Sequence, residues 1–194
     1  RYGQVKIHND KDIMCLNYEN IAEDYKPDLI KILLIGEAPP SNGKKYFYKV
    51  PEKCSFSKKI EDDRSLPATI FNHYFNKRPQ DSDEYKKYLD CLRNNGVFLI
   101  DMINEPLKIR DDKEKGGINK DNLDKIFSDM NLYLLKTRIS GLINDKTQII
   151  FLVPRNYKKV LKNKLSELLG IALDRNNYFP WKHFRLKTNE CFDC

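Results

Sequence analysis

A chain of 194 residues is short enough for one domain and long enough to bury a core. Hydrophobic residues make up 40% of it, which excludes an intrinsically disordered polymer, and no apolar run reaches the roughly eighteen residues that span a bilayer. Lysine and arginine outnumber aspartate and glutamate by 35 to 28, a net charge of +7. This excess favours encounter with a polyanion such as DNA, because neutralised phosphates release counterions. A solvated lysine-rich surface is the alternative explanation.

The first expected elements are a helix over residues 12–25, a doubly buried strand over 29–36, and a helix over 66–75. Asp81 or Ser82 can cap a further helix that runs to about Asn94. A second buried strand is expected over 97–102, followed by a mobile charged loop over 108–117.

One long helix is expected from Asn119 to Leu142, then a strand over 148–153, a helix over 156–169 and a short strand over 177–179. The side chains of this long helix that are expected to face the core are Leu123, Ile126, Phe127, Met130, Leu134 and Leu135.

Alternating strands and helices predict an α/β protein, with a parallel sheet covered on both faces. We expect a single domain over residues 1–194, a three-layer α/β/α sandwich around a central, mainly parallel, four-stranded sheet. In such sheets the functional loops follow the carboxyl ends of the strands, here residues 36–41, 101–106 and 154–157.

The five cysteines are odd in number and widely spaced, which predicts reduced thiols in a cytoplasmic protein. No secretory signal is evident at the first residues. Cys191 and Cys194 form a C-x-x-C pair, but two ligands do not complete a metal site, so no metal is expected. An iron–sulfur cluster that also uses Cys15, Cys54 or Cys91 is the alternative.

The loop after the first strand carries the richest set of chemical groups. Gly36 allows a sharp turn, and Pro39 and Pro40 stiffen the backbone, so that Glu37 and main-chain amides face one cleft. Flat faces for stacking come from the aromatic residues that follow: Tyr46, Phe47 and Tyr48. The alternative is a rigid turn with core aromatics. The spacing of a phosphate-binding loop is absent.

Two short motifs resemble the uracil-DNA glycosylase superfamily. G-E-A-P at residues 36–39 is similar to the first motif of its thermostable-type branch, and G-V-F-L-I-D at 96–101 is similar to its second-strand signature. G-E-x-P-P followed by a glycine and Y-F-Y also resembles poorly characterised glycosylase-like proteins. The resemblance covers about residues 30–184 and implies a uracil-DNA-glycosylase-like fold that hydrolyses the N-glycosidic bond of a base flipped out of DNA.

The resemblance also implies roles for individual residues. Glu37 lies in the loop that activates water or stabilises the oxocarbenium-like sugar, and Asp101 reads the edge of the base. One of Tyr46, Phe47 or Tyr48 stacks on the base. The remaining base-binding candidates are Gly36, Ala38, Pro39, Pro40 and Asn104.

Three departures from the family pattern bear on the substrate. Ala38 replaces an aspartate that activates water in many relatives, and Pro40 replaces a bulky tyrosine, which leaves room at the fifth carbon of the base. Asp101 stands where uracil readers have asparagine. Because an ionised carboxylate only accepts hydrogen bonds, we hypothesise a base with an amino group, such as a 5-substituted cytosine. A capping role for Asp101 is the alternative.

The third family motif is not intact. Its nearest equivalent, residues 179–185, offers His183 to stabilise the charge of the leaving base, although a surface histidine is the alternative. Candidates for phosphate contacts are Lys44, Lys45, Lys58, Arg155, Lys158 and Arg185. The alternative for each lysine is a solvated surface side chain without a phosphate contact.

The sequence therefore predicts a monomeric, cytoplasmic DNA glycosylase that needs no cofactor and acts in repair or in defence against modified foreign DNA. The first alternative is a catalytically inactive base- or nucleotide-binding protein on the same fold, which Ala38 and the missing third motif favour. The second alternative is an enzyme that acts on free nucleotides or nucleosides, and the net positive charge of the chain argues against it.

Overall fold

The computed structural model describes residues 18–40, 46–57, 65–107 and 120–153, together with 157, 160–165, 167, 170, 178–179 and 192. Its strands form one parallel sheet in the order β2-β1-β3-β4. The bounds are β1 Ile32–Gly36, β2 Val97–Asp101, β3 Gln148–Leu152 and β4 Tyr178–Phe179. An α/β chain with a parallel sheet is thereby confirmed, although β4 has only two residues.

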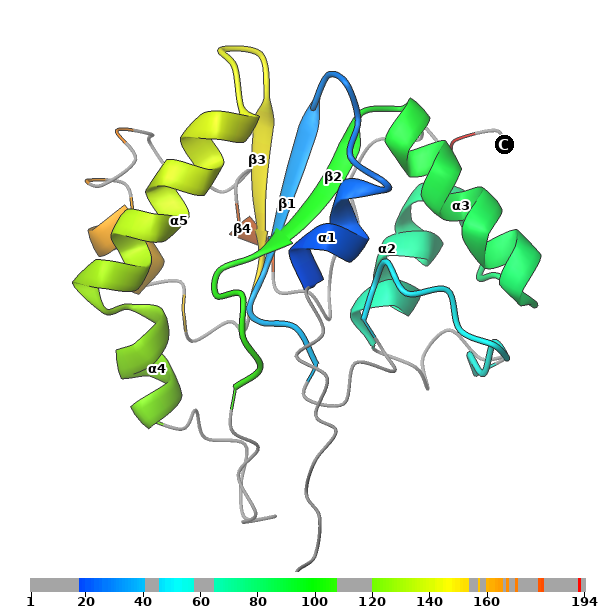
Figure 1. Ribbon diagram of the computed structural model, residues 1–194, viewed down its shortest axis with the longest axis horizontal. Coiled ribbons are helices and arrows are strands. Elements are labelled where there is room, and N and C mark those ends of the chain that lie inside the picture. Colours follow the sequence, from blue (N-terminus) through cyan, green and yellow to red (C-terminus); the bar gives the residue numbers. More distant parts are fainter. Residues whose placement is uncertain are drawn as a thin grey trace, which may run out of the picture.

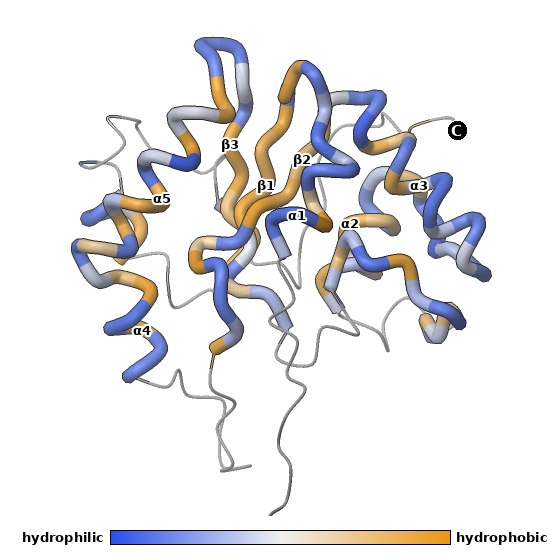
Figure 2. The backbone as a smooth tube through the Cα atoms, viewed as in Figure 1, coloured by the Kyte–Doolittle hydropathy of each residue, from blue (hydrophilic) through white to orange (hydrophobic). Residues whose placement is uncertain are grey.

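The sheet is buried because its strands are apolar on both faces. β1 pairs with β2 on one side and β3 on the other, and Leu33, Leu34 and Ile35 have no exposed surface. Figure 2 shows the three longer strands as the most continuously hydrophobic part of the chain. The expectation of doubly buried strands holds for these segments, but the first strand expected over 29–36 begins only at Ile32, and Leu29 is 57% exposed.

Helices lie on both sides of the sheet, with α4 and α5 on one side and α2 and α3 on the other (Figure 1). Their bounds, with the short first helix, are α1 Tyr18–Glu23, α2 Leu66–Phe75, α3 Ser82–Asn94, α4 Lys120–Ile126 and α5 Asp129–Leu142. Ser65 caps α2 and Asp81 caps α3, each by accepting a hydrogen bond from a backbone amide of the first turn. The expected bounds of these two helices are confirmed.

The single long helix expected from Asn119 to Leu142 is wrong. The Ser128 side chain accepts a hydrogen bond from the amide of Asn131, which starts α5 as a separate helix after α4. The new helix begins in a different rotational frame, so Met130 and Leu134 are 70% and 51% exposed. The side chains that α5 buries are Leu132, Leu135 and Ile139, so the expectation is confirmed for Leu135, as it is for Ile126 and Phe127 before α5.

Tyr48 protects the free edge of the sheet. Its hydroxyl accepts a hydrogen bond from the amide of Leu99 at 2.6 Å and donates one to the carbonyl of the same residue at 3.1 Å. Among the described residues β2 has no strand neighbour on this side, so the phenol satisfies the two backbone groups that a further strand would satisfy. Tyr48 and Phe47, each 4% exposed, thereby join the core on the side of α3.

The structure also bears on the state of the cysteines and on the search for a membrane-spanning helix. Cys54 is a free thiol, but Cys91 is disulfide-bonded, so the prediction of reduced thiols is wrong for Cys91. The odd count excluded complete pairing and did not exclude one bridge. In the part of the chain that the structure describes, no helix combines the length and apolarity that crossing a membrane requires.

Several predicted segments lie outside the described residues. They are the beginning of the first helix, the charged loop at 108–117 and parts of the helix expected over 156–169. Within that last range the structure has a π-helical turn, η2, over Leu161–Leu165.

Candidate functional site

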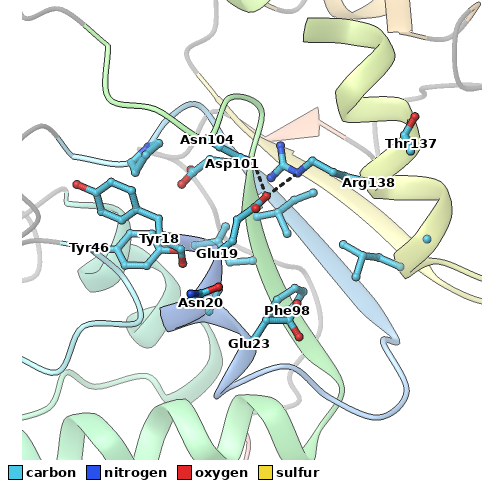
Figure 3. Close-up of a pocket in the computed structure, with 16 residues that line it drawn as sticks. Tyr18, Glu19, Asn20, Glu23, Tyr46, Phe98, Asp101, Asn104, Thr137 and Arg138 are labelled. Carbon is cyan, nitrogen blue, oxygen red and sulfur yellow. Dashed lines mark hydrogen bonds and ion pairs between the residues drawn. The ribbon is translucent and has the colours of Figure 1, made fainter. Parts of the chain in front are cut away.

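A groove of about 390 Å³ opens between α1, the carboxyl end of β2 and α5 (Figure 3). Of the candidate residues from the sequence, those that line it are Asp101, Pro39, Tyr46 and Asn104. The carboxyl ends of the strands lie at the lower end of the sheet in Figure 1, where parallel α/β proteins bind their ligands. The volume is within the range of small-molecule sites, roughly 300–1,000 Å³.

Asp101 ends β2 at the wall of this groove and is partly buried. Among the residues that the structure describes, none forms a hydrogen bond with its carboxyl group. Burial raises the pKa of this carboxyl to about 7, Arg138 opposes the rise, and the charge of Glu37 adds to it. Near neutral pH the group is therefore divided between a protonated form that donates and an ionised form that only accepts.

Gly36 makes the position of Asp101 possible. The two residues are register partners on adjacent strands, and a Cβ atom built on Gly36 would lie 2.6 Å from Oδ1 of Asp101. Any other residue would push the carboxyl aside. The glycine of the first motif thus makes room for the carboxyl of the second, beyond its expected role in a turn.

Glu37, the first catalytic candidate, has a different environment. The hydroxyl of Tyr157, a buried residue beyond β3, donates a hydrogen bond to its Oε1 atom. Burial raises the pKa of Glu37, and this hydrogen bond works in the opposite direction. Glu37 is not one of the groove-lining residues, so the structure couples it to Asp101 by charge but does not bring it into the same wall.

Arg138 is a groove residue that the sequence reasoning missed. It extends from α5, with its side chain 22% exposed, and its Nε lies 3.5 Å from Oε1 of Glu19 on α1. Asn104, after β2, donates a hydrogen bond to the same glutamate oxygen. Burial lowers the pKa of Arg138, against the neighbouring acidic groups. Charges from three elements therefore meet at the mouth of the groove.

A sequence signal for Arg138 existed once the start of α5 was known. Asn131, Leu135, Arg138 and Leu142 follow one another at spacings of four, three and four residues, which places them on one helical face. Asn131 donates a hydrogen bond to the carbonyl of Met102 at 3.2 Å, so this face is turned toward the end of β2. An arginine on that face was the clue to a polar site.

All three aromatic candidates belong to the core cluster, and of the three Tyr46 is the one that also lines the groove. The hydroxyl of Tyr46 donates to the carbonyl of Tyr18 at 3.0 Å, and the hydroxyl of Tyr18 donates to the carbonyl of Pro40 at 2.7 Å. These bonds tie the first loop to α1. Ala38 packs against the core. The ring of Tyr46 is 7% exposed and packs edge to face against Tyr18 and Tyr48.

The remaining predicted site residues lie outside the described part of the chain: His183, Lys44, Lys45, Lys58, Arg155, Lys158 and Arg185. Among the residues described, no group of three or more histidine, cysteine, aspartate or glutamate side chains is arranged to hold a metal ion.

Comparison with known proteins yields no relative. No family model matches the chain, and neither a curated protein nor a solved structure is significantly similar to it.

Proposed function

We propose that the groove beside β2 receives a base flipped out of DNA and that the protein is a DNA glycosylase with a uracil-DNA-glycosylase-like fold. The observation that carries this proposal is the carboxyl group of Asp101. It lies partly buried in a groove of ligand size, and no described residue forms a hydrogen bond with it. Burying a polar group without a partner is costly, so such a group in a groove suits a ligand that supplies the partner.

The arrangement of the two motifs supports the same reading. Residues 36–39 and 96–101 are distant in sequence, yet Gly36 and Asp101 are register partners at the carboxyl ends of adjacent parallel strands. Tyr46 also lines the groove. A carboxyl group and an aromatic side chain in one groove provide hydrogen-bonding and apolar groups for a planar base.

The ionisation of Asp101 refines the hypothesis about the base. With a pKa of about 7, the carboxyl group accepts from an exocyclic amino group when ionised and can also donate to a carbonyl oxygen when protonated. The preference for an amino-bearing base, including a 5-substituted cytosine, is therefore proposed for the ionised form.

Catalysis is assigned to Glu37 in this proposal. Cleavage of the N-glycosidic bond develops positive charge on the sugar, which a partly buried carboxylate at the end of β1 would stabilise. A second candidate function, base binding without catalysis, is favoured by one specific observation. Glu37 is held by Tyr157 and does not line the groove.

The test is a base-release assay by mass spectrometry, on DNAs that carry uracil, hypoxanthine, 5-methylcytosine and bulky 5-substituted cytosines. We expect release of one base by the wild type and by the Glu52→Gln variant, which changes an exposed carboxylate elsewhere. Glu37→Gln should abolish release and retain DNA binding. Tight DNA binding with no release would support the non-catalytic alternative, and absence of both would refute the two readings together.

A further inference from the structure

The guanidinium of Arg138 has unused hydrogen-bonding capacity. Among the described residues, its one ion pair or hydrogen bond is the pair between Nε and Glu19, at 3.5 Å. An arginine carries five N–H donors, and its two terminal nitrogens remain open to a ligand. The side chain is 22% exposed and lines the same groove as Asp101.

Arg138 and Asp101 face one space from two elements, α5 and the end of β2 (Figure 3). Their charges influence each other, because Asp101 raises the pKa of Arg138 and Arg138 lowers that of Asp101. Lining one groove, a guanidinium and a carboxyl group offer a donor and an acceptor to the same ligand. This pattern complements the edge of a nucleobase, where a carbonyl oxygen or ring nitrogen lies beside an N–H group.

The other charges of the groove oppose a phosphate. The acidic residues that line it are Glu19, Glu23 and Asp101, and the one cationic side chain among the described lining residues is Arg138. Glu23 pairs with Lys26 at 3.1 Å, and the two other acidic lining residues, Glu19 and Asp101, are the ones whose charges act on Arg138. A phosphate at Arg138 would meet both carboxylates, whereas a neutral heterocycle would not be repelled.

We propose that Arg138 is a second base-reading residue, which donates from its terminal nitrogens to an acceptor on the base edge while Asp101 pairs with the neighbouring position. This inference rests on the proposed base-binding function and adds to it a residue and a ligand class. The groove takes a neutral planar heterocycle with adjacent donor and acceptor groups, and the phosphates of the DNA stay outside it.

The experiment measures binding of cytidine, uridine, adenosine and guanosine by calorimetry, with ribose 5-phosphate and inorganic phosphate as competitors. For the nucleoside that binds best, Arg138→Gln should weaken binding by about tenfold or more, as expected for a hydrogen bond to a charged group. Arg138→Lys keeps the charge beside Glu19 and Asp101 but loses the forked donors, so it should also lose most of the affinity. Lys136→Gln, an exposed charge change on the same helix, is the matched control.

Melting temperatures of all variants show whether the fold is retained, and Arg138→Lys is the decisive variant if Arg138→Gln unfolds. Equal affinities for the Arg138→Lys and Lys136→Gln variants would overturn the role of Arg138. Displacement of the nucleoside by either phosphate compound would overturn the ligand class, and no binding of any nucleoside at millimolar concentration would overturn the inference as a whole. The base-release assay then decides separately whether the proposed function survives.

Discussion

The ends of β1 and β2 are neighbours in the sheet, and each carries a carboxyl group, but their surroundings differ. β1 is an interior strand, and Glu37 after it receives a hydrogen bond from Tyr157. β2 is an edge strand, and Asp101 at its end has no hydrogen bond with any described residue and faces a groove. One carboxyl is fixed by a tyrosine of the protein, while the other lines a groove without a hydrogen-bond partner among the described residues.

This difference shows that the position of a carboxylate after a buried strand does not by itself indicate a functional site. What decides its role is whether a third element supplies a partner. Tyr157 follows β3 and reaches Glu37 from 120 residues away in the sequence. At Asp101, α5 contributes Arg138, which acts through its charge without a hydrogen bond.

The largest expected effect comes from Asp101→Asn. Because burial raises the folded-state pKa of Asp101 from 3.8 to about 7, the folded protein retains a proton that the unfolded chain releases. The free energy of unfolding should therefore fall as pH rises from about 4 to 7, by at most about 4 kcal/mol. Asparagine should remove this decline and stabilise the protein at pH 8. Urea unfolding at pH 5 and pH 8 measures it, with Asp28→Asn as an exposed control. An unchanged pH dependence would contradict the buried environment of Asp101.

Tyr48→Phe tests how the edge strand is held. Loss of the hydroxyl leaves the amide and carbonyl of Leu99 without their partner, and we expect a loss of about 3 kcal/mol in the free energy of unfolding. The control is Tyr133→Phe, because the Tyr133 side chain is 64% exposed. Hydrogen exchange at the Leu99 amide should accelerate in the Tyr48 variant alone. Equal stabilities of the two variants would show that the edge needs no such support.

Tyr157→Phe should leave Glu37, like Asp101, without its side-chain hydrogen bond. Removing the hydrogen bond should raise the pKa of Glu37 further, because that bond opposes the effect of burial. The free energy of unfolding should fall by about 2 kcal/mol, the usual contribution of a hydrogen bond to a charged group. An NMR titration of the Glu37 carboxyl carbon reports the pKa directly. A lowered pKa would mean that Tyr157 is not the group that fixes Glu37.

The smallest effect is expected from Gly141→Ala, at the end of the groove near Leu142. A Cβ atom at Gly141 meets no atom within 4 Å, in contrast to Gly36, where it would lie 2.6 Å from Asp101. Alanine in α5 should therefore add about 0.5–1 kcal/mol of stability through helix propensity. Thermal unfolding measures the gain, and the corresponding Gly36→Ala variant should show no such gain. Equal gains at both positions would argue against the close approach of Asp101 to Gly36.

The strands and the capped helices were predictable from local patterns. Apolar runs marked β1, β2 and β3, and Asp81 marked the start of α3. Ser128 does not stand out as a cap in the sequence, because the apolar periodicity of its segment continues across it. The helical frame of α5, and with it the inward position of Arg138, is therefore not predictable from local pattern.

The site was predictable only where it depends on strand ends. The positions of Asp101 and Tyr46 follow from the motifs. Which of the three aromatic residues lines the groove does not, because it depends on Tyr48 being held at the edge of β2 by its bond to Leu99. The Tyr157 partner of Glu37 is a contact between distant segments, and no local pattern in the sequence indicates it.

The hydroxyl of Tyr48 also limits how copies of the protein can associate. An open strand edge is a template on which another chain can add its own strand, which is a common route to aggregation and to domain swapping. At Leu99 that template is occupied from within, since the phenol already takes both backbone groups. A chain that adds to β2 at this point must first displace a side chain that is 4% exposed, so growth of the sheet from this edge requires partial unfolding.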